Sequence, residues 1–101
     1  MIHVQLVSRR NENLQTLIRN AIGQGRIKSL ETAKVKGGVR ITHKKHPGSI
    51  SLARTKGPLL ATISCTNPLK EWQLLETFVG RLAYHFAANL AAINIQFEAD
   101  R

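Results

Sequence analysis

The sequence predicts an α+β fold: an antiparallel sheet, made of a four-strand meander plus an N-terminal and a C-terminal strand, with two helices on one face. Three observations predict it. Two stretches repeat apolar residues at helical spacing, both ends of the chain alternate apolar with polar residues, and glycine and proline turns divide the region between the helices. The expected element order is β-α-β-β-β-β-α-β, and the 101 residues are expected to form one domain over 1–101.

The N-terminal part of the chain predicts a strand followed by a helix. Apolar and polar residues alternate over 2–7, which is typical of a strand with one buried face. Ser8 or Asn11 is expected to cap the helix, and Gly23 and Gly25 are expected to end it. The apolar residues of this helix recur at helical spacing and are Leu14, Leu17, Ile18, Ala21 and Ile22.

Residues 30–65 predict the four-strand meander, and side-chain parity tests its turns. A three-residue loop over 36–38, with Gly38 in the left-handed conformation, keeps apolar residues opposite apolar ones and sets Lys34 directly opposite Arg40. A two-residue Gly37-Gly38 loop would mix the two faces. We therefore expect the three-residue loop.

The two later turns of the meander keep the same parity. A turn at Pro47-Gly48 opposes His43 to Leu52, and a turn at Lys56-Gly57 opposes Leu52 to Ala61. The three turns are mutually consistent, so we expect one apolar face covered by both helices and one polar face open to solvent.

The second helix has a recognisable start and a wide apolar arc. Asn67 is a favourable N-cap and Pro68 a favourable first helical residue. About 20 residues follow at helical spacing, and their apolar side chains are expected to pack on the sheet. The residues of this arc are Trp72, Leu75, Phe78, Val79, Leu82, Ala83, Phe86 and Leu90. After Asn89 the pattern changes to alternation, which predicts a final strand over 93–98.

Positive charge is distributed unevenly along the chain. Lys and Arg total 15 against 6 acids, which gives a net charge of +9. All of the excess lies in residues 1–58, where Glu12 and Glu31 are the only acids, whereas residues 59–101 are nearly neutral and hold every Phe, Tyr and Trp. This imbalance indicates a polyanionic partner.

The polar face of the meander is expected to be basic and to bind phosphates. Lys34 opposite Arg40 would be a pair of like charges, which destabilises a sheet unless an anion lies there. A nucleic-acid backbone would relieve that repulsion and release counterions. The expected nucleic-acid-binding residues are Lys34, Lys36, Arg40, Lys44, Lys45, Arg54 and Lys56, with Arg9 and Arg10 as secondary contacts.

The expected function is non-enzymatic nucleic-acid binding. The predicted basic face carries no aromatic residue on which single-stranded bases could stack, which favours a duplex or a structured RNA or DNA. The alternative is a protein-interaction module that docks on an acidic protein partner, and a merely solvated basic face would need no partner at all. The apolar helix face and the unpaired end strands leave room for a homodimer.

Other classes of function have little support in the sequence. Cys65 is the only cysteine, so we expect neither a disulfide framework nor a structural metal site, and no cofactor is implied. On a strand, the imidazoles of His43 and His46 would point to opposite faces, which ranks a small nuclease last and leaves no catalytic residue assigned. Residues 1–8 lack the charged start and long apolar core of a signal peptide, and the sequence has no run of about 20 apolar residues. A cytoplasmic protein without membrane binding is therefore expected.

Overall fold

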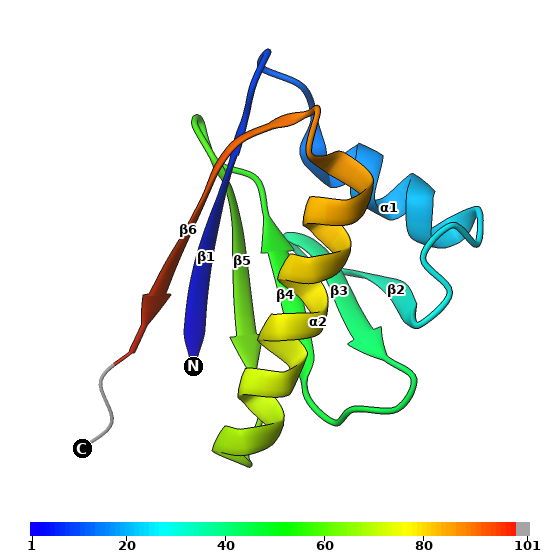
Figure 1. Cartoon of the computed structure of the whole chain (residues 1–101), viewed down its shortest axis with the longest axis vertical. Helices are drawn as coiled ribbons and strands as arrows, with labels where there is room; N and C mark the ends of the chain where they lie inside the picture. Colours follow the sequence, from blue (N-terminus) through cyan, green and yellow to red (C-terminus); the bar gives the residue numbers. More distant parts are fainter. Residues whose placement is uncertain (99–101) are drawn as a thin grey trace.

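The computed structural model describes residues 1–98, in which six strands and two helices follow the predicted order (Figure 1). The strands are β1 (Ile2–Ser8), β2 (Leu30–Val35), β3 (Gly38–His43), β4 (Ser49–Ala53), β5 (Leu59–Ser64) and β6 (Leu90–Phe97). The helices are α1 (Leu14–Gly23) and α2 (Pro68–Phe86). The α+β fold predicted from the sequence is confirmed.

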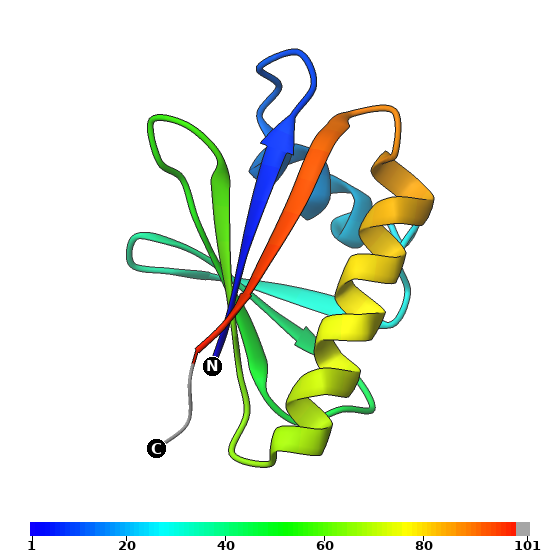
Figure 2. The same cartoon turned by 60° about the vertical axis from the view of Figure 1, so that its left-hand side comes forward.

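The six strands form one antiparallel sheet in the order β2-β3-β4-β5-β1-β6. Strands β2 to β5 are the predicted meander, and β1 lies between β5 and β6 (Figure 2). The two edges of the sheet are therefore β2 and β6. Each edge strand has a row of backbone groups without a strand partner among the described residues.

Both helices cover the same face of the sheet. The inward residues of the strands, such as Val4, Ile41 and Ile63, are completely buried. They form one cluster with Ile18 of α1 and Phe78 of α2, which places both helices on this face (Figures 1 and 2). The burial of this apolar cluster is the main driving force of the fold.

Helix α1 begins later than the sequence predicts. Its N-cap is Asn13, whose side chain accepts a hydrogen bond from the backbone N–H of Thr16 at 3.2 Å. The expected caps, Ser8 and Asn11, are not used. Ser8 belongs to β1, and Asn11 has a left-handed backbone with φ of 61°, which cannot lead directly into a right-handed helix.

The first hairpin of the meander has a two-residue turn in place of the predicted three-residue loop. Val35 pairs with Gly38, so Lys34 lies opposite Val39 and not opposite Arg40. The left-handed residue of the turn is Gly37, with φ of 86°. Gly38 is required for a different reason, because a Cβ there would collide with the carbonyl oxygen of Leu52 on the neighbouring strand.

The second turn is wider than predicted, but the faces of the strands are as expected. Leu52 lies opposite Val39 and not opposite His43. The segment 44–48 is a loop, held at one end by a hydrogen bond from the N–H of Lys44 to the carbonyl of Ser29 at 3.0 Å. The shift between the observed and the predicted pairing of β3 with β4 is an even number of residues, so it leaves the side chains of these two strands on their predicted faces.

The third turn of the meander is confirmed. Leu52 lies opposite Ala61 and Ile50 opposite Ile63, as the parity of the sequence predicts. The side chain of Thr55 holds the loop together. Its hydroxyl donates to the carbonyl of Pro58 at 2.6 Å and accepts from the N–H of Gly57 at 3.1 Å.

Helix α2 begins at its predicted cap but is rotated about its axis. The side chain of Asn67 accepts hydrogen bonds from the N–H groups of Leu69 and Lys70 at 3.0 and 3.4 Å. The buried residues are Glu71, Leu74, Phe78, Leu82 and Phe86. Trp72, predicted in the core, is 53% exposed.

Ala83 was also predicted in the core and is exposed. Leu74 is buried, although it was not part of the predicted arc. The apolar arc of α2 is wider than the stripe that contacts the sheet. The helix turns its Leu74 side to the sheet and leaves its Trp72 side toward β6.

Candidate functional site

The open face of the sheet is largely neutral. Arg40 is the member of the predicted set that lies on it, and the residues across from it on successive strands are Ser51, Thr62, His3 and Gln96. Lys34 shares the helix-side row with Val39, although its side chain is exposed. The predicted cross-strand pair of Lys34 and Arg40 is therefore wrong, because a one-residue change of register moves a side chain to the opposite face.

Most of the predicted cations gather instead at one end of the sheet. Three loops lie at this end of the strands: the β1–α1 loop (9–13), the β2–β3 turn (36–37) and the β4–β5 loop (54–58). The pairing of Leu6 with Leu59 and of Val39 with Leu52 assigns them to this end. The sheet is twisted, so in Figure 2 the β1–α1 and β4–β5 loops project at the top while the β2–β3 turn projects to the left. We refer to these three loops as the loop end.

The loop end carries five exposed cations and one acid. The cations are Arg9, Arg10, Lys36, Arg54 and Lys56. The acid, Glu12, accepts a hydrogen bond from the side-chain amide of Asn89, so it is held against the turn between α2 and β6. Lys34 and Arg40 lie a few residues farther along the strands, which extends the positive region.

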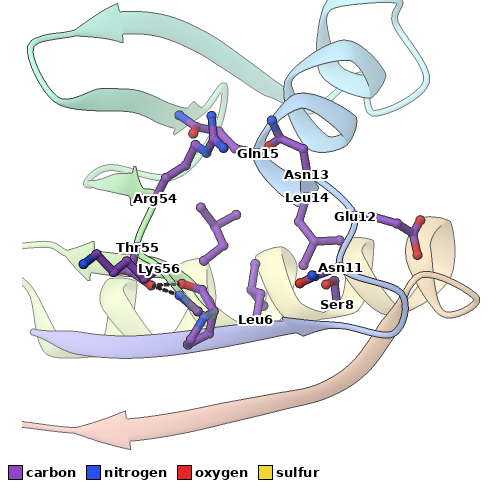
Figure 3. A pocket seen from close by; sticks show the side chains of 13 residues that line it. Leu6, Ser8, Asn11, Glu12, Asn13, Leu14, Gln15, Arg54, Thr55 and Lys56 are labelled. Atoms are coloured by element: carbon purple, nitrogen blue, oxygen red, sulfur yellow. Dashed lines mark hydrogen bonds between the residues drawn. The ribbon is translucent and has the colours of Figure 1, made fainter.

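A hollow of about 250 Å³ separates the β1–α1 loop from the β4–β5 loop. Its lining includes Asn13, Gln15, Arg54 and Lys56. Figure 3 shows Arg54 and Gln15 pointing toward one another across it, while Glu12 points away. The hollow therefore combines a guanidinium, a side-chain amide and the start of a helix, all of which can donate hydrogen bonds to an anion.

The two N-terminal arginines of the predicted set have different roles in the structure. The N–H of Arg9 donates to the carbonyl of Asn89 at 2.8 Å, and its guanidinium donates to the carbonyl of Leu90 at 3.1 Å. Arg9 therefore ties the β1–α1 loop to the start of β6. Arg10 is exposed, and its guanidinium is available to a ligand.

Lys44 and Lys45 lie at the opposite end of the sheet, in the β3–β4 loop, and are not brought together with the other predicted residues. Their neighbours His43 and His46 were expected to point to opposite faces. That expectation is wrong, because the loop bends and brings the two ring centroids to 4.3 Å.

The imidazole of His43 is surrounded by positive charge. Burial lowers the pKa of His43 below its ordinary value, and the charges of His46, Lys45 and Arg81 lower it further. Its Nδ1 atom accepts a hydrogen bond from the N–H of Lys45 at 2.9 Å, which leaves Nε2 to carry the proton. Arg81 could not be linked to this loop from the sequence, because only the tertiary fold brings α2 next to it.

Within residues 1–98 no three His, Cys, Asp or Glu side chains are grouped closely enough to hold a metal ion. Neither of the helices in this part of the chain is long and apolar enough to cross a membrane. Comparisons with protein families, with curated proteins and with solved structures found no match.

Proposed function

We propose that this protein binds nucleic acid through phosphate contacts made by the loop end. The observation that carries the proposal is the concentration of exposed cations on three loops whose single acid is hydrogen-bonded elsewhere. Each Lys or Arg that neutralises a phosphate releases condensed counterions, which is the dominant source of sequence-independent affinity.

The loop end favours a duplex or a folded nucleic acid over an unstructured single strand. Its three loops contain no Phe, Tyr or Trp on which a base could stack. The exposed aromatic residues, Trp72, Tyr84 and Phe97, belong to α2 and β6. Cations on separate loops can instead contact phosphates on both sides of a groove, which fixes position without reading bases.

The test compares two variants of equal charge. The first changes Arg10, Lys36, Arg54 and Lys56 to Gln at the loop end. The second changes Arg26, Lys28, Lys44 and Lys45 to Gln at the opposite end. All eight residues are exposed, so both variants are expected to fold as the parent does.

Each protein is titrated with duplex DNA, duplex RNA and single-stranded RNA of equal length over a series of salt concentrations. We expect the loop-end variant to lose most of the affinity, and its slope of log K against log salt to flatten by about 0.9 for each lost phosphate contact. The variant at the opposite end should lose much less.

Equal losses in the two variants would show diffuse attraction and overturn the assignment to the loop end. Absence of binding by the parent at moderate salt would overturn nucleic acid as the partner. The charge would then be explained by an acidic protein partner or by a merely solvated basic surface.

A further inference from the structure

Two rows of apolar side chains face each other beside β6, and no side chain of residues 1–98 covers them fully. Trp72, Leu75 and Val79 recur on one side of α2, and Ile95 and Phe97 lie on the helix side of β6. Trp72 is 53% exposed, Ile95 42% and Phe97 60%. Both rows have the pattern of core residues in the sequence, yet α2 covers them only in part.

The gap between the two rows is a groove of about 660 Å³. Its lining includes Ile2, Trp72, Leu75 and Phe97. Its two charged members are both paired: buried Glu71 binds the amino group of Met1 at 3.2 Å, and exposed Glu98 binds His3 at 3.2 Å. We call this surface, together with the free edge of β6, the β6 seam. Exposed apolar side chains that are gathered in one place are typical of an interaction site.

The free edge of β6 is regular over Ile93–Phe97, and its bulge lies at the other end of the strand, beside Leu90. Natural edge strands are usually blunted by Lys, Pro or inward charges, and Leu90–Phe97 contains none of these. The N–H of Glu98 donates to the carbonyl of Met1. This bond shows that the even-numbered residues at this end of β6 direct their backbone N–H and C=O groups toward β1. By that alternation, Ile93, Ile95 and Phe97 direct their N–H and C=O groups outward, as far as the bulge at Ala91.

We propose that a second copy of this chain docks on the β6 seam, with β6 pairing antiparallel to β6 of its partner about a two-fold axis at Asn94. This register places Ile93 opposite Ile95 on the helix side, and Phe97 opposite Ala91, the extra residue of the bulge in β6. It also pairs Ile93 and Ile95, whose backbone groups are free, as hydrogen-bonded pairs.

The sequence of β6 is complementary to itself when the strand is turned end to end, and this favours a second copy over an unrelated strand. A two-fold axis at Asn94 leaves every odd-numbered position opposite another apolar residue, and Ala92 opposite Gln96 on the open face. The two sheets become one, so the two α2 helices lie on the same side of it. Their Trp72 rows then meet across the seam and complete the cover over β6.

Charge and size are both compatible with this dimer. Two molecules of net charge +9 repel each other, but the strand that would pair carries no Lys or Arg, so the repulsion is not concentrated at the seam. A strand of 8 residues is about 27 Å long, and α2, of 19 residues, is about 28 Å long. A strip of that length in two layers can bury the roughly 800 Å² per partner of a stable interface.

The test measures the mass of the full chain in solution, after bound nucleic acid has been removed, by sedimentation over a wide range of concentrations. The parent is expected to be a dimer. Ile95→Lys places a charge in the seam and is expected to give a folded monomer with an unchanged circular dichroism spectrum. Gln73→Lys adds the same charge to the exposed side of α2 and should remain a dimer.

A cross-link tests the register. In a Cys65→Ser background, Asn94→Cys is expected to form a disulfide-linked dimer, because the two Cα atoms at the axis lie about 4.5 Å apart in a non-hydrogen-bonded pair. Ser51→Cys, in the middle of the open face, should stay unlinked. A monomeric parent at all concentrations, a dimer that survives Ile95→Lys, or a dimer that does not cross-link through Asn94→Cys would each overturn the proposal.

Discussion

The imidazole rings of His43 and His46 lie with their centroids 4.3 Å apart, at an interplanar angle of 40°, on either side of two lysines in sequence. The approach of the two rings depends on the wide β3–β4 loop. A tight hairpin at Pro47-Gly48 would have continued β3 through His46, whose ring would then point to the face opposite that of His43. The arrangement concentrates four potential positive charges on one short segment, which is unfavourable when all are protonated.

We therefore expect the stability of the protein to fall as the pH drops through 6.5, the ordinary pKa of histidine. Burial and the nearby charges lower the pKa of His43 in the folded state, so the unfolded chain takes up the proton first and acid favours unfolding. Urea unfolding measured between pH 5 and pH 8 should show this loss, and His43→Gln should reduce it. His85→Gln is the control, and a loss of the same size in both variants would contradict the role of His43.

Side-chain parity predicts buried strand residues well wherever one face of a strand is fully covered. Val4, Ile41 and Leu52 are all buried as the alternation indicates. The parity of β2 was misassigned because its turn contains two adjacent glycines, and each can supply the left-handed conformation. The close approach of Gly38 to Leu52 decides between them, and that contact involves a strand farther along the chain.

The candidate site is less predictable than the fold, because its residues come from loops. Alternation assigns a residue to a face only inside a strand, and among the predicted cations only Lys34 and Arg40 lie in strands. Lys36 and Lys44 lie at opposite ends of the sheet, and this can be predicted because successive turns of a meander alternate between its two ends. The length of the β3–β4 loop, which separates Lys44 and Lys45 from the rest, has no clear sequence signal.

The glycines of the meander provide a stability series with an internal control. Gly48 has φ of 99°, and a Cβ there would lie 2.6 Å from the carbonyl oxygen of Ser64, so Gly48→Ala should cost about 1–3 kcal/mol. Gly38→Ala should cost at least as much, because it forces β3 and β4 apart. Gly57→Ala meets no atom within 4 Å and should be nearly neutral. Equal melting temperatures for the three variants would contradict these backbone assignments.

The two arginines of the β1–α1 loop should separate stability from binding. Arg9→Ala removes the hydrogen bond to the carbonyl of Leu90 and should lower the free energy of unfolding by about 1 kcal/mol. Arg10→Ala should leave stability unchanged and weaken nucleic-acid binding, because its side chain is exposed. Thermal unfolding and a binding titration on both variants check this, and a destabilised Arg10→Ala would show that the loop is held differently.

The rotation of α2 can be tested with two leucines five residues apart. Leu74 is completely buried, whereas Leu69 is 64% exposed, although the predicted arc included neither. Removing a buried leucine side chain loses its transfer free energy and leaves a cavity, so Leu74→Ala should cost about 2–5 kcal/mol. Leu69→Ala should cost under about 0.5 kcal/mol, since the side chain is already largely in water. Urea unfolding of both variants at one protein concentration gives the comparison. A loss at Leu69 equal to that at Leu74 would mean that α2 presents a different side to the sheet, and Trp72 would then no longer face β6.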